Sequence, residues 1–297
     1  MYDSMIRQIT TYLPPSVAQA VRALPADKLA RLEELRFRMD CEVSAVFAGR
    51  EGPLSLTAPL VCTAAMLQGI LNAATGYSAY AAGDAMRQGF LPLQGGHRLG
   101  LCGTAVLDGG QLTAIKEPSS LNLRIAKAWT GCADGVLQAM EGRMESTLLL
   151  GPPGSGKTTL LRDLVRQLSD RYGQRMGVVD SRGELAACVG GRPQLPIGRR
   201  TDVISLAPKE AGMELLLRVM NPAWIAVDEI TAAADLEAMA RAGYCGVRLL
   251  ATAHGFGPEE LRRRPLYRQL AELGIFRNLL VLDGNKQARM ERMEDVC

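Results

Sequence analysis

The N-terminal part of the chain mixes two hydrophobic periods. Apolar residues recur at helical spacing in four stretches, which are 16–24, 27–39, 63–75 and 78–90. Apolar and polar residues alternate over 41–49 and 90–115, and glycine pairs at 95–96 and 109–110 divide the longer stretch as hairpin turns do. This mixture predicts a smaller N-terminal α+β domain over residues 1–125.

The rest of the chain has a different pattern. Short apolar runs alternate there with helix-like segments, and the runs are 147–150, 176–180, 225–228, 247–252 and 279–282. Such runs are typical of strands buried on both faces, as in a parallel sheet covered by helices. We therefore expect an α/β domain over residues 126–297. Its charged last residues, 285–297, are expected to form a helix or a frayed tail.

The composition is that of a globular protein, and 297 residues are enough for two domains. A net charge of +3 and an aromatic content of 5% argue against a nucleic-acid partner. No apolar stretch approaches the roughly 18 residues that a membrane span needs, and the N-terminus lacks the apolar region of a signal peptide. The seven cysteines are scattered without a CxxC pair, which favours reduced thiols in a cytosolic protein over a zinc site.

The segment TLLLGPPGSGKTTL, residues 147–160, carries the most specific motif. It matches GxxxxGK[ST] between a predicted strand and a predicted helix, which is the context of a phosphate-binding loop. Lys157 is expected at the β- and γ-phosphates and the Thr158 hydroxyl at Mg²⁺. The expected nucleotide-binding residues are Gly151, Pro152, Pro153, Gly154, Ser155, Gly156, Lys157, Thr158 and Thr159. The alternative is a glycine-rich turn that binds no ligand.

Two acidic residues end the apolar run WIAVDEI, residues 224–230. Asp228 is expected to hold the Mg²⁺, and Glu229 is expected to polarise the attacking water as a general base. The alternative is a solvated turn. The guanine-reading pattern Asn-Lys-x-Asp has only one near match, NKQA at 285–288, and it lacks the aspartate. ATP is therefore the predicted nucleotide.

Two further strand ends carry polar residues. In VVDSRGELA, residues 178–186, Asp180 ends a run and can contact Mg²⁺ or cap the following turn, and the sequence leaves both roles open. In LLATAHGFG, residues 249–257, the run ends in Thr252 and His254. Taken alone, His254 would be a packed core histidine. Because its strand is expected to follow the Asp228 strand, we predict that His254 senses the γ-phosphate.

These sites occur in the order found in the stage III sporulation protein AA family, which the chain resembles over nearly its whole length. The segments that carry the resemblance are LEELRFR, GGHRLGLCGTAV, SSLNLRIAK, GPPGSGKTTLLRDL, VVDSRGELAAC, RTDV, MNPAWIAVDEI and ATAHG. More broadly, the chain resembles the type II/IV secretion and pilus-motor ATPases. The resemblance implies a RecA-like P-loop NTPase core and a hexameric ring of chains with nucleotide between subunits.

In the secretion ATPases, arginines of the N-terminal domain help to bind the γ-phosphate. The resemblance therefore makes Arg98 and Arg124 candidates for this catalytic role, with Arg200 as a third. A guanidinium stabilises charge on a transferring phosphoryl group. Each of the three can equally form a surface or interdomain salt bridge. His97, beside Arg98, is expected to be a turn histidine.

The predicted activity is hydrolysis of ATP with Mg²⁺. The resemblance implies that a ring-shaped homo-oligomer energises or gates a membrane-spanning sporulation complex from the mother-cell cytoplasm, with other proteins spanning the membrane. A RecA-like nucleic-acid motor is one alternative, because 261–269 contains a basic cluster that is otherwise a solvated helix face. A scaffold that binds ATP in order to assemble, with little hydrolysis, is the other.

Overall fold

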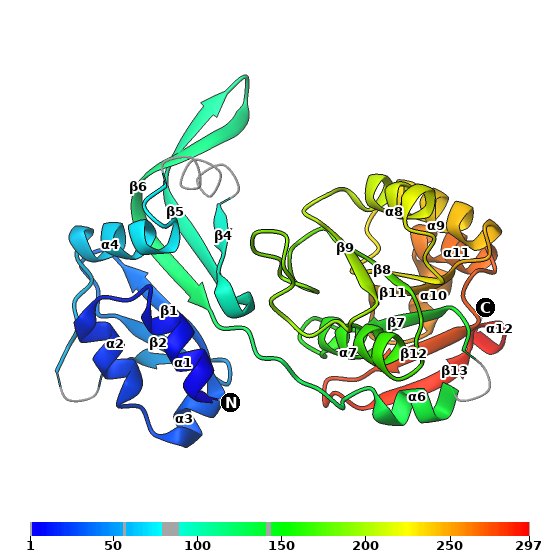
Figure 1. Cartoon of the computed structure of the whole chain (residues 1–297), viewed down its shortest axis with the longest axis horizontal. Coiled ribbons are helices and arrows are strands. Elements are labelled where there is room, and N and C mark those ends of the chain that lie inside the picture. Colours follow the sequence, from blue (N-terminus) through cyan, green and yellow to red (C-terminus); the bar gives the residue numbers. More distant parts are fainter. Residues whose placement is uncertain (1, 56–57, 79–88, 141–143, 297) are drawn as a thin grey trace. The chain divides into compact units, whose positions relative to one another are not determined.

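The computed structural model describes residues 2–55, 58–78, 89–140 and 144–296 of the chain. It divides into two compact units, Met1–Lys127 and Ala128–Cys297, and Figure 1 shows both. The sequence places the boundary after residue 125, two residues before the division in the structure. Among the described residues, no helix is both long enough and apolar enough to cross a membrane.

The N-terminal unit is built on one antiparallel sheet. Its helices are α1 (Tyr2–Thr10), α2 (Pro15–Arg22), α3 (Ala26–Arg31), α4 (Ala64–Ala74) and the 3₁₀ turn η1 (Gln94–Gly96). Its strands are β1 (Leu32–Arg38), β2 (Ser44–Phe47), β3 (Arg50–Pro53), β4 (Phe90–Pro92), β5 (Arg98–Asp108) and β6 (Gln111–Arg124), in the order β3-β2-β1-β6-β5-β4. Helices α1 to α4 contribute to a single apolar core with the sheet.

The helix predicted over 27–39 is wrong beyond Arg31, where the chain becomes strand β1. From Leu35 onward the burial has a period of two, because Leu35 and Phe37 are fully buried. The polar residues alternate with them, and Arg36 donates to Glu34 two positions away at 2.8 Å. Leu32 and Leu35 can both face the core because the strand register shifts between Leu32 and Glu34. The resulting spacing of three residues between them looks like that of a helix.

The helix predicted over 78–90 falls mostly on residues 79–88, which lie outside the described part of the chain. The hairpin prediction for 90–115 is confirmed, since β4, β5 and β6 pair in succession. Gly109 and Gly110, at φ +55° and +81°, form the two-residue turn between β5 and β6.

The C-terminal unit contains a seven-stranded sheet. Its strands are β7 (Thr147–Gly151), β8 (Met176–Asp180), β9 (Thr201–Ser205), β10 (Trp224–Val227), β11 (Arg248–His254), β12 (Asn278–Leu282) and β13 (Ala288–Arg292), in the order β13-β12-β7-β11-β10-β8-β9. Its helices are α6 (Asp134–Met140), α7 (Lys157–Asp170), α8 (Lys209–Val219), α9 (Ala233–Tyr244), α10 (Glu259–Arg263), α11 (Pro265–Glu272) and α12 (Met293–Val296). All strand pairs are parallel except β12 with β13.

Helices cover both faces of this sheet, which confirms the prediction from the apolar runs. Along β7, Leu148 and Leu150 belong to one apolar cluster and Leu149 belongs to the other. The first cluster includes residues of α8, α9, α10 and α11, and the second includes residues of α6 and α7. Figure 1 shows where these helices lie around the sheet. Strands buried on both faces read as continuous apolar runs.

The prediction of a helix or frayed tail over 285–297 is largely wrong, because Ala288–Arg292 form strand β13 and only a short helix follows. Strand β13 pairs with β12 along its whole length and covers an edge of the sheet. Arg292 anchors it, with Nη1 2.6 Å from Glu145 Oε2 and 2.8 Å from Asn278 Oδ1. Strand β13 is rich in charged residues because it is the edge strand of the sheet, where side chains remain in contact with water.

Candidate functional site

The phosphate-binding motif forms a loop between β7 and α7. Gly151 ends the strand in a crowded position, where a β-carbon would lie 2.7 Å from Ser155 Oγ and 2.9 Å from the carbonyl oxygen of Leu282. Gly156 precedes the helix at φ +92°, which favours glycine. The motif glycines therefore meet steric requirements of a tight strand–loop–helix turn, and its helix N-terminus offers unpaired N–H groups for an anion.

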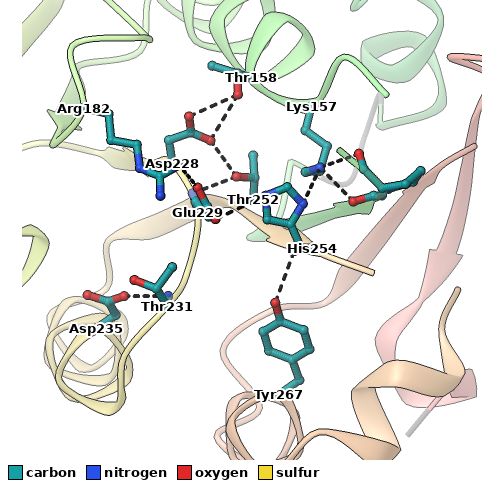
Figure 2. A network of polar contacts seen from close by, with 12 residues as sticks. Lys157, Thr158, Arg182, Asp228, Glu229, Thr231, Asp235, Thr252, His254 and Tyr267 are labelled. Atoms are coloured by element: carbon teal, nitrogen blue, oxygen red, sulfur yellow. Dashed lines mark hydrogen bonds and ion pairs between the residues drawn. The ribbon is translucent and has the colours of Figure 1, made fainter. Parts of the chain in front are cut away.

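The Lys157 ammonium lies inside this loop. Its Nζ donates to the carbonyl oxygens of Gly151 at 2.7 Å and Pro152 at 2.9 Å, and it lies 3.2 Å from His254 Nδ1 (Figure 2). Burial lowers the pKa of Lys157, and the nearby carboxylates of Asp228 and Glu229 oppose that shift. All three ammonium donors have acceptors within the site.

Asp228 follows β10, and its carboxylate accepts hydrogen bonds both from the loop and from the neighbouring strand β11. Thr158 Oγ1 donates to Asp228 Oδ2 at 3.1 Å, and Thr252 Oγ1 donates to Asp228 Oδ1 at 2.6 Å. The register explains this convergence, since Val227 on β10 pairs with Ala251 and Thr252 on β11 pairs with Leu149 on β7. Parallel strands bring their carboxyl ends to one edge of a sheet, and the predicted metal residues Asp228 and Thr158 meet there.

Glu229 lies between two basic side chains. One carboxylate oxygen, Oε2, forms an ion pair with Arg182, and the other, Oε1, lies 3.2 Å from His254 Nε2. The Glu229 backbone has φ +52°, and its N–H donates to Thr252 Oγ1 at 2.8 Å. Asp235 holds the next segment by accepting the N–H groups of Thr231 and Ala232. A left-handed non-glycine residue held on both sides aims its side chain in a fixed direction.

His254 is held by its backbone as well as by its ring. Its N–H donates to the hydroxyl of Tyr267 at 3.2 Å, and its carbonyl accepts from Arg264 Nη1 at 3.2 Å. Arg264 also pairs with Glu260 at 2.5 Å. Part of the basic cluster at 261–269 therefore supports the site. Figure 2 shows the resulting line of contacts from Lys157 through His254 and Glu229 to Arg182.

The metal role predicted for Asp180 does not agree with its surroundings. Asp180 is 1% exposed, and its two carboxylate oxygens accept four backbone N–H groups at 2.8–3.1 Å, those of Glu184, Leu185, Ala186 and Ala187. Both oxygens are engaged in folding the segment after β8. The capping alternative therefore describes Asp180, and these four bonds leave the predicted metal role without support.

The three candidate arginines lie in different places. Arg98 and Arg124 belong to the N-terminal unit, where Arg98 stacks on the Phe90 ring at 3.6 Å and Arg124 Nε lies 3.6 Å from Glu34 Oε1. Arg200 immediately precedes β9, whose first residue pairs with the first residue of β8. Its guanidinium donates to the Gly173 carbonyl at 3.0 Å. Arg200 therefore lies at the amino edge of the sheet, opposite the phosphate-binding loop of its own chain.

The sequence predicts no role in the ATP site for Arg182, Arg264 or Tyr267, although the last two lie in the basic cluster at 261–269. The signal for Arg182 was its position two residues after a strand-end acid, at the same edge as Asp228. Arg264 and Tyr267 gave no such signal, because Arg264, between α10 and α11, and Tyr267, on α11, follow His254 in the chain and reach it only in the folded unit. His97, predicted as a turn histidine, does follow the turn η1, but it is only 2% exposed and accepts the Ala126 N–H at Nδ1.

A parallel sheet with a P-loop at its carboxyl edge, joined to a smaller α+β unit, defines a RecA-like P-loop NTPase fold. Two solved structures share it: the ATPase DotB of Legionella pneumophila (TM-score 0.57, 16% identity, 93% of this chain and 78% of that one) and the pilus retraction motor PilT with bound ADP (TM-score 0.58, 16% identity, 84% and 74%).

The family is established by sequence. The family model described as sporulation stage III, protein AA matches residues 6–293, and the chain belongs to that family. The stage III sporulation protein AA of Bacillus subtilis is 33% identical over 286 residues, which cover 95% of this chain and 92% of that protein.

Proposed function

We propose that the chain is a Mg²⁺-dependent ATPase whose hydrolytic site is the network in Figure 2. The observation that carries this proposal is the 3.1 Å contact between Thr158 of the phosphate-binding loop and Asp228, with Glu229 following directly. A phosphate grip, a metal-binding carboxylate and a general base thus meet at one edge of the sheet. Those are the groups that phosphoryl transfer to water requires.

The residues present fit a magnesium ion. Mg²⁺ prefers oxygen ligands and usually takes one or two from the protein, with phosphates and water completing its shell. The Thr158 hydroxyl and the Asp228 carboxylate converge as such oxygens. When bound, the ion would neutralise charge on the β- and γ-phosphates. The hydroxyl of Thr252, bonded to Asp228, orients the carboxylate for that role.

In the proposed reaction Lys157 leaves the carbonyls of Gly151 and Pro152 and pairs with phosphate oxygens. Glu229 accepts a proton from the attacking water, whose oxygen bonds to the γ-phosphorus while the bond from that phosphorus to the bridging oxygen breaks. The products are ADP and phosphate, and the proton leaves through the carboxylate. His254 lies between Lys157 and Glu229, and a change at either reaches it directly.

We further propose that the ATPase works as a ring-shaped homo-oligomer, a hexamer by family resemblance. Arg98 or Arg124 would contact the γ-phosphate in cis or across a subunit boundary, and turnover would move the N-terminal unit about residues 125–130. The description of PilT as a retraction motor, in a protein of the same fold, supports a motor. The family name supports a sporulation role, in which the motor drives or gates a membrane complex from the mother-cell cytoplasm.

The test is phosphate release by the purified full chain with ATP and Mg²⁺. We expect wild type and the control Lys116→Ala, which changes an exposed lysine on β6, to hydrolyse ATP. Lys157→Ala should be about 100-fold slower or worse, since it loses the ammonium that binds the phosphates. Native mass with and without ATP, read together with the hydrolysis rate, separates a motor from a scaffold. A scaffold assembles when ATP binds but barely hydrolyses it. Stimulation by DNA would favour the nucleic-acid motor. Equal rates for Lys157→Ala and wild type would eliminate the ATPase.

A further inference from the structure

A second feature adjoins the phosphate-binding loop on the side away from the acids. It is a pocket of about 350 Å³, lined by Ser155, Gly156 and the first turn of α7, by the segment before α6, and by the β12–β13 hairpin. All of these residues belong to the C-terminal unit. Small-molecule pockets have volumes of a few hundred Å³ or more, so this one is large enough for a nucleoside.

The order of the strands shows which end of a bound nucleotide would reach the pocket. Strand β7, which leads into the loop, lies between β11 on one side and β12 on the other. Strand β11 carries His254 and adjoins the Asp228 strand, whereas β12 ends at Leu282, which lines the pocket. A triphosphate whose γ-phosphate faces Glu229 and His254 therefore extends from the loop toward β12, and its nucleoside end meets the pocket.

The lining of the pocket suits a flat, mostly apolar ring. Trp129 lines it and is 61% exposed, whereas the other tryptophan, Trp224, is fully buried on β10. Leu282, Leu160 and Ala288 add apolar surface. The buried hydroxyl of Ser155, which lines the same pocket, has no hydrogen-bond partner among the described residues. An exposed indole and a buried hydroxyl without a partner among the described residues are both suited to contact a bound ligand.

The polar groups of the pocket also restrict the ligand. Guanine presents N–H donors at N1 and N2, and a site that selects it needs an acceptor such as a carboxylate facing them. None of the described residues that line the pocket is acidic. Ala288 stands where the guanine-reading pattern would have its aspartate, and Lys286 offers only donors. The Cys132 thiol is neutral, because burial raises its pKa to about 11.

We infer that this pocket binds the purine base of the nucleotide, with Trp129 as the stacking platform and without selection for guanine. The inference rests on the proposed function, since it assumes that the loop holds the phosphates. It adds a base-reading site built from the segment before α6 and the β12–β13 hairpin. Stacking on an aromatic ring adds affinity for any base but favours the larger purines.

The test compares a ligand with a base and one without, using the full chain. Binding of ADP and of inorganic tripolyphosphate is measured by calorimetry for wild type, Trp129→Ala, Trp129→Phe and Lys157→Ala. We expect Trp129→Ala to weaken ADP binding about 10- to 100-fold, Trp129→Phe to stay within about 3-fold, and tripolyphosphate binding to change in neither. Equal weakening of both ligands in Trp129→Ala, or no weakening of ADP, would overturn the inference.

Two further measurements keep the outcomes separate. In wild type, ADP should quench the exposed Trp129 emission and tripolyphosphate should not, a readout that needs no variant. The affinity should be at least as high for ADP as for GDP, and higher for both than for UDP. If wild type binds neither ADP nor tripolyphosphate, or if Lys157→Ala weakens neither, the proposed function fails. If both bind and only the Trp129 results are negative, the base pocket alone fails.

Discussion

The Nζ atom of Lys157 lies 3.2 Å from Nδ1 of His254. An ammonium group has only donors, so Nδ1 accepts and the ring proton sits on Nε2, which faces Glu229 Oε1 at 3.2 Å. The histidine thereby connects the phosphate grip to the proposed base in one defined tautomer. A substitution that keeps an acceptor and a donor, such as glutamine, can retain part of this link.

Replacing His254 should therefore affect turnover more than binding. We expect His254→Ala to lower kcat about 100-fold, because the proposed base Glu229 loses a partner that positions it and such a base contributes about that much, while ADP affinity changes less than about 3-fold. His254→Gln should recover part of kcat. Steady-state kinetics and ADP calorimetry on the three proteins provide the measurement. A loss of ADP affinity with kcat unchanged would show that His254 only shapes the loop.

Thr252 should be essential for the placement of both acids. Its hydroxyl accepts the Glu229 N–H and donates to Asp228, and the side chain is 1% exposed. Thr252→Val keeps the shape and removes both bonds, so we expect a stability loss of about 1–3 kcal/mol and at least a 10-fold fall in kcat. Thr252→Ser keeps the hydroxyl and serves as the control. Denaturant unfolding and phosphate release would measure the two effects, and a valine variant with wild-type kcat would contradict this role.

Asp180 should matter for folding and not for the metal. Asp180→Ala leaves four backbone N–H groups without their carboxylate, and we expect it to lose about 3 kcal/mol of stability or more. The Mg²⁺ concentration that half-saturates hydrolysis should stay unchanged. A titration of Mg²⁺ at fixed ATP is the measurement. A 10-fold higher Mg²⁺ requirement in a variant of wild-type stability would restore the metal role.

The N-terminal unit should lose stability in mild acid through His97. Burial lowers its pKa to about 4, so between the ordinary value near 6.5 and about 4 the unfolded chain binds a proton that the native state does not. Stability therefore falls as pH falls through that window, by about 3 kcal/mol in all. His97→Gln, which keeps an acceptor for the Ala126 N–H, should remove this dependence. Hydrogen exchange of β5 and β6 at several pH values follows the effect, and identical pH profiles for the two proteins would contradict it.

The sequence predicted most of the C-terminal unit because its apolar runs have one physical cause, burial on both faces of a sheet. It also predicted the loop and the positions of Asp228 and Glu229 after a strand, since a motif and a strand end are local features. It failed at 32–38, where the shifted register between Leu32 and Glu34 spaces apolar residues as a helix does. It missed Arg182 although that residue follows a strand-end acid, because its ion pair with Glu229 depends on how the segment 181–187 folds. It missed Tyr267 because its contact with His254 depends on where 265–272 folds, which no local pattern encodes.

The central claim is that Glu229 activates water against a phosphate held by the Lys157 loop. Single-turnover hydrolysis of bound ATP by Glu229→Gln tests it most directly, with Glu237→Gln on the exposed face of α9 as the matched control. The amide keeps the size of the side chain but accepts no proton, so we predict ATP affinity within about 3-fold of wild type and a rate lower by about 10²-fold or more, with the control unchanged. A Glu229→Gln variant that hydrolyses bound ATP at the wild-type rate would contradict the claim.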